Sequence, residues 1–299
     1  MKIVRFESPS DRQPRVGILQ ERGVLDFSAA YQAHRRAEGL DEPLLTSPMP
    51  LLEQGLFTAD TFARAAGFAR EQGLAEKLMV APPRLLAPVP WPGKIIALGL
   101  NYASHAREGG KEPPDHPIIF QKASSAVIGP EEPILIKQWF TRVDPEIELA
   151  VVIGRAAREV PAAEAMAYVA GYTIVNDVTE RNMQAADIGA AHPWFRSKSI
   201  DTFCPMGPCI ALPDQVGDPG ALDLELRVNG QARQKANTRD LVFGIPRLIE
   251  FISRHMTLQP GDIISTGTPA GIAPIVPGDV VECEIEKIGV LRNPVRTEA

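Results

Sequence analysis

The sequence predicts a mainly β, α+β fold, in which a small N-terminal α/β unit precedes a larger body built as a sheet sandwich or roll. Three observations support this prediction. From Lys94 onward, short apolar runs of strand length alternate with turns, predicted helices are few, and 28 prolines and 24 glycines punctuate the 299 residues. Neither G-x-G-x-x-G nor G-x-x-x-x-G-K-[ST] occurs, so the pattern does not favour a doubly wound nucleotide-binding fold.

Residues 1–80 are expected to form the small α/β unit. They contain three short strand-like runs, "KIVRF", "RVGILQ" and "GVLDFS", followed by apolar residues at helical spacing near 28–38 and 58–78. The next segment, "APPRLLAPVPWPG" (residues 81–93), holds five prolines. So many prolines exclude a helix or a central strand, and we therefore expect a Pro-rich linker before a body of residues 94–299.

The body is predicted to be dominated by strands. Helices are expected only near residues 100–108, 161–169, 179–188 and 240–254. The predicted strands lie in "KIIALGL", "PIIFQKAS", "EIELAVVIG", "GYTIVNDV", "LDLELRVNG", "DIISTG" and "DVVECEIEKIG". The segment "CPMGPC" is interpreted as turn-rich because of its prolines and glycine.

Charge and composition limit the classes of partner. The net charge is −6, which argues against nucleic acid or an anionic membrane as a partner. The N-terminus lacks an apolar signal region, and no apolar run reaches the ~18 residues of a membrane span, so we expect a cytoplasmic protein. Cys204, Cys209 and Cys283 lack the paired spacing of a zinc site and are expected to be small buried residues.

The stretch "DPEIELAVVIG" places two glutamates one residue apart in an apolar strand. Glu146 and Glu148 share one strand face, ~7 Å apart, where two carboxylates repel by roughly 2–3 kcal/mol. Asp177 lies at the end of the next predicted strand, so three carboxylates can converge on a hard divalent cation such as Mg²⁺, Mn²⁺ or Ca²⁺. The alternatives are a solvated strand face for the glutamates and a helix N-cap for Asp177.

Five other residues have the character of catalytic or substrate-binding groups. His105 and Glu108 are three residues apart, so on a helix their side chains would lie next to each other. The carboxylate could then orient the imidazole as a general base, or the two residues could form an ordinary surface pair. Lys198 lies in an apolar segment where a lysine needs an anionic partner, unless it is simply solvated. Arg181 and Gln184 are expected to share a helical face with Asp177 and to bind a substrate carboxylate, or to be surface residues.

Five motifs resemble those of the fumarylacetoacetate hydrolase (FAH) family in order and spacing, over about residues 92–292. They are "NYASHARE", "DPEIELAVVIG", "VNDVTERNMQ", "SKSIDTFCPMGP" and "STGTPAGI". The resemblance implies a mixed β-sandwich roll of the FAH catalytic type, usually a homodimer, close to the acylpyruvate hydrolase and 2-hydroxyhepta-2,4-diene-1,7-dioate isomerase members.

The resemblance also implies roles for single residues. It makes Glu146, Glu148 and Asp177 ligands of Mg²⁺ or Mn²⁺, His105 and Glu108 a water-activating dyad on a lid, and Lys198 a contact of substrate oxygens. It makes Arg181, Gln184 and Thr268 substrate-binding residues.

The resulting hypothesis is a metal-dependent hydrolase that cleaves a C–C bond in a 2,4-dioxo acid, of the acylpyruvate or fumarylpyruvate type, through a metal-bound pyruvate enolate. An oxaloacetate-type decarboxylase and a hydroxydienoate isomerase use the same intermediate and stay open as alternatives. A third alternative is a cation-stabilised binding module, which needs no base.

Overall fold

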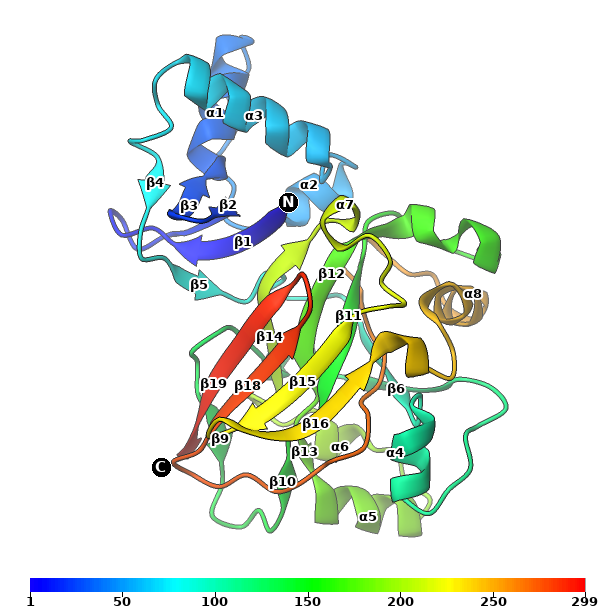
Figure 1. The fold of residues 1–299 in the computed structure, drawn as a ribbon. Helices are drawn as coiled ribbons and strands as arrows, with labels where there is room; N and C mark the ends of the chain where they lie inside the picture. The colour runs from blue at the N-terminus through cyan, green and yellow to red at the C-terminus, as the bar shows by residue number, and fades with distance from the viewer. Residues whose placement is uncertain (299) are drawn as a thin grey trace.

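The computed structural model describes residues 1–298 and has two parts that share one sheet (Figure 1). Asp26 accepts a hydrogen bond from the Ala29 amide and so caps the first helix of the N-terminal part, while Thr58 caps the third. The elements of this part are β1 (Lys2–Glu7), β2 (Pro14–Gln20), β3 (Gly23–Asp26), α1 (Phe27–Ala37), α2 (Met49–Glu53), α3 (Ala59–Glu71), β4 (Met79–Val80) and β5 (Arg84–Leu86).

The body contributes most of the strands, with short helices between them. Its elements are β6 (Ile95–Gly99), α4 (Ala103–Glu108), β7 (Ile118–Lys122), β8 (Val127–Ile128), β9 (Ile134–Ile136), β10 (Val143–Asp144), β11 (Ile147–Ile153), β12 (Val169–Asn176), β13 (Thr179–Glu180), α5 (Arg181–Gly189), α6 (Phe195–Lys198), β14 (Cys204–Ala211), α7 (Pro213–Val216), β15 (Asp223–Val228), β16 (Gln231–Asn237), α8 (Ile245–His255), β17 (Ile263–Ser265), β18 (Val280–Ile285) and β19 (Gly289–Thr297). Three 3₁₀ helices complete it: Ser124–Ala126, Ala162–Tyr168 and Thr238–Asp240.

The large sheet has the strand order β4-β3-β2-β1-β14-β12-β11-β17-β6-β7, and a second sheet has the order β16-β15-β18-β19-β9. Antiparallel pairing of β1 with β14 joins the N-terminal strands to the body. The predicted mixed sandwich roll with an N-terminal α/β part is therefore confirmed. The boundaries placed at residues 80 and 94 stay a prediction, because the sheet runs through both parts.

Two hydrophobic cores lie on opposite faces of the large sheet. Ile147, Leu149 and other odd-numbered residues of β11 pack into the core shared with the second sheet and α8. Ala150 and Val152 point the other way, into the core that also contains apolar residues of α1, α2 and α3. The alternation expected for this strand is confirmed, and both of its faces are buried.

The turn interpretation of "CPMGPC" is wrong, because these residues belong to the buried strand β14, between β12 and β1. Tyr172 pairs with Ala211 while Ile174 pairs with Gly207, so the register shifts across Pro208. A proline is tolerated there because an irregular position needs no ladder N–H. The three cysteines are free and buried, as expected.

Several element boundaries also differ from the predictions. Helix α3 ends at Glu71 rather than near residue 78, and α8 begins at Ile245, where Pro246 occupies the first turn. The segment 162–168 is a 3₁₀ helix, and the segment before Ser199, for which no helix was predicted, forms the short helix α6. Strands β9, β16 and β19 were not predicted; β16 is mostly polar and therefore lacks an apolar strand pattern.

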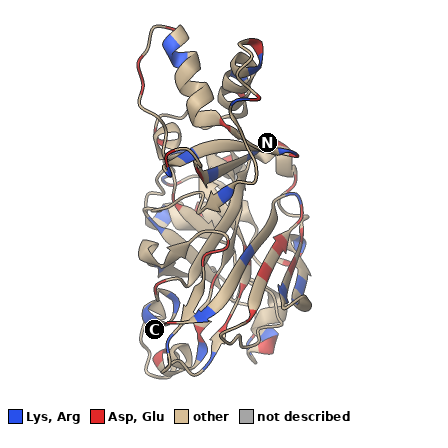
Figure 2. Ribbon diagram, turned by 90° about the vertical axis from the view of Figure 1, so that its left-hand side faces the viewer, with Lys and Arg blue, Asp and Glu red and all other residues tan. Residues whose placement is uncertain are grey.

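Basic and acidic residues are interspersed along the N-terminal helices and the sheets (Figure 2). The expected lack of a nucleic-acid partner stays a prediction. Within residues 1–298, no helix combines the length and the apolar composition needed to span a bilayer. Figure 1 shows α4, α5 and α6 together at the end of the molecule opposite α1 and α3. His105 on α4, Gln184 on α5 and Lys198 on α6 line the cavity of the predicted site.

Candidate metal and acid–base site

Three carboxylates converge at the ends of two paired strands. Glu146 immediately precedes β11, Glu148 lies in it, and Asp177 follows β12. The antiparallel register sets Ile147 opposite Asn176, so Glu146 and Asp177 become neighbours, and the Asp177 amide donates to the Glu146 carbonyl at 2.8 Å. One oxygen from each carboxylate lies within 4.8 Å of the others, and all three residues are buried.

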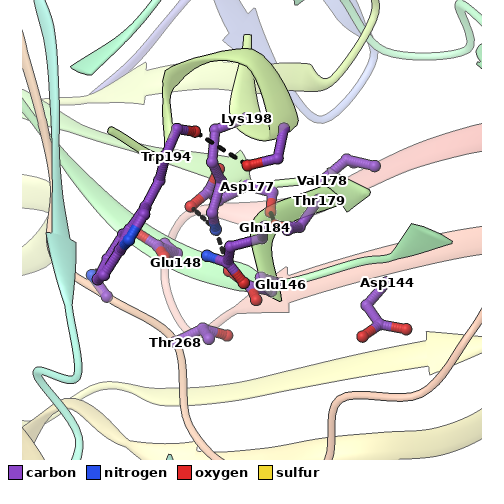
Figure 3. A network of polar contacts seen from close by, with 12 residues as sticks. Asp144, Glu146, Glu148, Asp177, Val178, Thr179, Gln184, Trp194, Lys198 and Thr268 are labelled. Atoms are coloured by element: carbon purple, nitrogen blue, oxygen red, sulfur yellow. Dashed lines mark hydrogen bonds and ion pairs between the residues drawn. The ribbon is translucent and has the colours of Figure 1, made fainter. Parts of the chain in front are cut away.

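Two of these carboxylates are paired with a buried lysine. The Lys198 ammonium donates to Glu146 Oε2 at 2.7 Å and to Asp177 Oδ2 at 2.6 Å (Figure 3). Burial lowers the pKa of Lys198, but its attraction to the two carboxylates outweighs this and raises the pKa overall. The prediction that Lys198 needs an anionic partner is therefore confirmed by its contacts.

Arg181, the first residue of α5, forms a second set of ion pairs. Its guanidinium pairs with Glu146, donates to Asp144 Oδ2 at 2.8 Å and donates to Gln184 Oε1 at 2.7 Å. The attraction of Lys198 and Arg181 overcomes the cost of burial and holds the pKa of Glu146 below its usual range. Glu146 is thus fixed as a carboxylate from both sides.

Glu148 differs because no lysine or arginine of the described chain forms an ion pair with it. Its Oε2 accepts from the Ser265 hydroxyl at 2.6 Å and from the Gly267 amide at 2.8 Å. Burial, and then repulsion by Asp177, raise the pKa of Glu148 to about 8. Glu148 is therefore the carboxyl with the most to gain from an additional positive charge.

The donor set fits a hard divalent cation. Three buried carboxylates in reach of one another offer only oxygen ligands, which Mg²⁺, Mn²⁺ and Ca²⁺ prefer over the nitrogen and sulfur set of zinc. Burial and the neighbouring Asp177 raise the pKa of Glu148, and a cation ligated by this carboxyl would offset both effects. Glu146, Glu148 and Asp177 are thus the residues that would hold the ion.

The His105–Glu108 pair lies across a cavity of about 210 Å³ from these carboxylates. Both residues are on α4, and His105 Nδ1 lies 3.2 Å from Glu108 Oε2. The other Glu108 oxygen accepts from the Gly271 amide at 2.9 Å, which holds the carboxylate in place. When Nδ1–H donates to Glu108, Nε2 keeps its lone pair and can act as a base.

The "STGTPAG" segment supports both halves of the site with its backbone. The Gly267 amide donates a hydrogen bond to Glu148, and the Gly271 amide donates one to Glu108. Both amides are therefore bonded to side chains of the site. Gly267 and Gly271 have φ of +100° and +107°, and a Cβ on Gly271 would lie 2.1 Å from a carbonyl oxygen of β16. Between them, Thr268 Oγ1 accepts from Gln234 at 2.9 Å.

The structure brings the predicted site residues together. The cavity is lined by His105, Glu108, Glu146, Glu148, Arg181, Gln184, Lys198 and Thr268, and Asp177 is fully buried beside them. The N-cap alternative for Asp177 is wrong, because Glu180 caps α5. Asp177 also lies outside that helix, so the shared helical face was not the reason for its proximity to Arg181.

Sequence reasoning missed four supporting residues: Lys122, Asp144, Gln234 and Ser265. Lys122 is fully buried and pairs with Asp177 at 2.6 Å, and Asp144 holds Arg181. Lys122 had a signal that could have been used, since a lysine in the apolar run "PIIFQKAS" calls for a partner just as Lys198 does. Asp144 lies two residues before Glu146, on the same side of an extended chain.

A comparison with family models matches residues 94–296 to "Fumarylacetoacetate (FAA) hydrolase C-terminal". The chain belongs to the fumarylacetoacetate hydrolase family. The mitochondrial oxaloacetate tautomerase FAHD2A of Bos taurus is 40% identical over 308 aligned residues, covering 99% of this chain and 91% of that protein.

Two solved structures are similar along their full length. Maleylpyruvate hydrolase from Sphingobium sp. SYK-6 has a TM-score of 0.80 and 35% identity, covers 100% of both chains, and has also been solved with manganese(II) ion and pyruvate. 5-Carboxymethyl-2-hydroxymuconate delta-isomerase from Mycobacterium smegmatis has a TM-score of 0.75 and 35% identity, again covering 100% of both chains. The family thus includes hydrolases, isomerases and tautomerases.

Proposed function

We propose that this chain is a divalent-metal-dependent enzyme that hydrolyses a C–C bond in a 2,4-dioxo acid of the acylpyruvate type. One observation carries the proposal: Glu146 and Glu148 of the buried carboxylate triad line the same cavity as the His105–Glu108 pair. A binding module would need no oriented imidazole base opposite its metal ligands. The manganese(II) ion and pyruvate in the Sphingobium hydrolase support both the cofactor and the product.

The dyad would supply proton transfer. His105 Nε2 takes a proton from water as the water oxygen bonds to C4 of the substrate, with Glu108 stabilising the imidazolium. The C3–C4 bond then breaks, C4 leaves as a carboxylic acid, and the electron pair passes to the pyruvate fragment as its enolate. The imidazolium returns the proton to C3, which gives pyruvate. A cation on Glu146, Glu148 and Asp177 would act as a Lewis acid toward the 2-oxo acid.

The fixed cations of the cavity match the charge that develops in this reaction. Lys198 and Arg181 both line the cavity, and Phe120 lies 5.1 Å from the Lys198 ammonium, which restricts where that group can move. Buried cations that are already oriented stabilise an enolate without reorganisation at the moment of reaction. Gln184 and Thr268 add neutral polar groups to the cavity wall, where they would orient the substrate.

A second candidate is the keto–enol tautomerisation of oxaloacetate, favoured by 40% identity to the bovine tautomerase over nearly the whole chain. This reaction needs a proton removed from C3 and another delivered to the 2-oxo oxygen. The same dyad can move these protons without attack by water, so the two candidates differ only in the bond that changes.

The test is purified protein with Mn²⁺ or Mg²⁺ and acetylpyruvate, fumarylpyruvate or oxaloacetate as substrate. Hydrolysis is expected to consume enol absorbance and to release one pyruvate, measured with lactate dehydrogenase, per acid formed. Enol–keto conversion of oxaloacetate without pyruvate supports tautomerisation instead; CO₂ release indicates decarboxylation, and a shifted diene absorbance indicates isomerisation. If none of these substrates changes with either metal, the proposal is wrong.

We also propose that the protein forms a homodimer and is located in the cytoplasm. Light scattering of the purified protein measures the first, and fractionation of the native cell measures the second. Neither is required for the proton transfers described above.

A further inference from the structure

Lys122 is a buried charged group that the proposed chemistry does not use. It is the last residue of β7, its side chain is fully buried, and it does not line the cavity that would receive substrate. Placing an ammonium in such surroundings costs several kcal/mol unless it is paired and hydrogen-bonded. Its contacts therefore indicate what holds it there.

All the acceptors of Lys122 belong to the site. Its ammonium donates to Asp177 Oδ1 at 2.6 Å, to the Val178 carbonyl at 3.4 Å and to the carbonyl of Lys198. The three donors of the ammonium thus reach three acceptors. Because Lys198 binds the other Asp177 oxygen, the two lysines hold this carboxylate from opposite sides.

The end of β7 is attached to α6 at further points. The Ala123 amide donates to Ser199 Oγ at 3.0 Å, and the Phe120 ring lies under the Lys198 ammonium at 5.1 Å. The end of β7 therefore contacts Ser199, the backbone carbonyl of Lys198 and the Lys198 ammonium. Among these contacts, only the one from Lys122 also reaches a carboxylate of the triad.

We propose that Lys122 is a positioning residue that fixes the Asp177 carboxylate and the Lys198 backbone together. One buried ammonium then aligns a ligand of the metal with the lysine that faces the substrate. Groups that hold metal ligands in this way typically change metal affinity about 10- to 100-fold when removed.

If Lys122 served only to balance charge, its removal would have the opposite effect on Mn²⁺ affinity. Removing a positive charge beside three carboxylates makes the site more negative, which strengthens its attraction for a divalent cation. Loss of positioning weakens metal binding, because Asp177 Oδ1 loses its partner and the carboxylate can rotate. The direction of the change in Mn²⁺ affinity therefore distinguishes the two roles.

The experiment is Mn²⁺ titration by isothermal calorimetry of the full chain, well below its melting temperature. Lys122→Met removes the contacts, and Lys122→Gln keeps a shorter, neutral donor. Lys94→Met is a matched control, because Lys94 pairs with buried Asp262 at 2.6 Å but does not line the cavity. We expect K122M to bind Mn²⁺ about 10- to 100-fold more weakly, K122Q to fall between it and wild type, and K94M to bind like wild type.

Two results overturn the proposal. If K122M melts at a lower temperature but binds Mn²⁺ with wild-type affinity, Lys122 serves stability alone. If it binds Mn²⁺ more tightly, Lys122 acts through its charge rather than by positioning Asp177. Should K122M fail to fold, K122Q decides, since wild-type or tighter Mn²⁺ binding by the folded K122Q protein contradicts the proposal equally.

Discussion

Mn²⁺ affinity should depend on pH through Glu148. Burial and the neighbouring Asp177 raise the pKa of Glu148 to about 8, and its Oε2 accepts two hydrogen bonds, which leaves Oε1 as the oxygen that can carry a proton. A carboxyl must lose this proton to ligate a cation. For a single group with that pKa, the apparent affinity should be about 50-fold weaker at pH 6 than at pH 8, or about 2.3 kcal/mol.

The stability of the metal-free protein should change with pH in the opposite direction. The pKa of Glu148 is higher in the folded than in the unfolded chain, so the folded state binds the proton more tightly. Its contribution to stability is present below pH 4.5 and is lost as pH rises to about 8. Between pH 6 and pH 8 this amounts to about 2 kcal/mol, measured as the difference in urea unfolding between wild type and Glu148→Gln.

The affinity is measured by calorimetry at pH 6, 7 and 8 in buffers of different ionisation enthalpy, which also gives the number of protons released. We expect close to one proton at pH 7, and weak binding with little pH dependence for Glu148→Gln. His105→Asn should keep the wild-type slope, which separates Glu148 from the imidazole. A dissociation constant that stays flat from pH 6 to pH 8, with no proton release, refutes this reasoning.

Three other predictions concern single side chains. His105→Asn should lower kcat about 10²- to 10⁴-fold in the substrate assay while Mn²⁺ affinity stays within about twofold, and an unchanged kcat would remove His105 from the mechanism. Lys198→Met leaves Glu146 with Arg181 and Asp177 with Lys122 as their remaining cations, so metal-free urea unfolding should show a loss of about 1–3 kcal/mol, partly restored by excess Mn²⁺. Lys111 lines the cavity from the turn after α4, where its amide caps the helix on the Ala106 carbonyl at 2.9 Å. Lys111→Met should raise KM about tenfold for fumarylpyruvate but not for acetylpyruvate, which lacks the distal carboxylate; equal effects would exclude that contact.

The carboxylate triad was predictable because its signal is local. Glu146 and Glu148 interrupt an apolar alternation that is typical of a buried strand, and Asp177 ends the next such strand. Two consecutive buried strands of similar length pair as neighbours in most folds, so their polar ends meet. The structure adds the register, with Ile147 opposite Asn176, which sequence alone does not specify.

The supporting residues were not predictable in the same way, because their partners are distant in sequence. Lys122 is 55 residues from Asp177, and Ser265 is 117 residues from Glu148. These contacts depend on which strands are neighbours in the large sheet. Strand β14 was missed for a different reason: prolines normally exclude a central strand, and only the shifted register makes room for Pro208.

The charges of the buried cluster bear on the stability of the metal-free site and on the proposed binding of a metal and a 2-oxo acid. Its fully buried or nearly buried members are four carboxyl groups and three cations: Asp144, Glu146, Glu148, Asp177, Lys122, Arg181 and Lys198. With Glu148 protonated, the three negative charges of these buried members equal their three positive ones; Arg142, which pairs with Asp144 from the surface, lies outside this count. Binding a divalent cation with release of that proton changes the total to +1. A neutral cluster avoids the cost of an uncompensated buried charge, whereas a loaded cluster would favour the anionic 2-oxo acid that we propose as substrate.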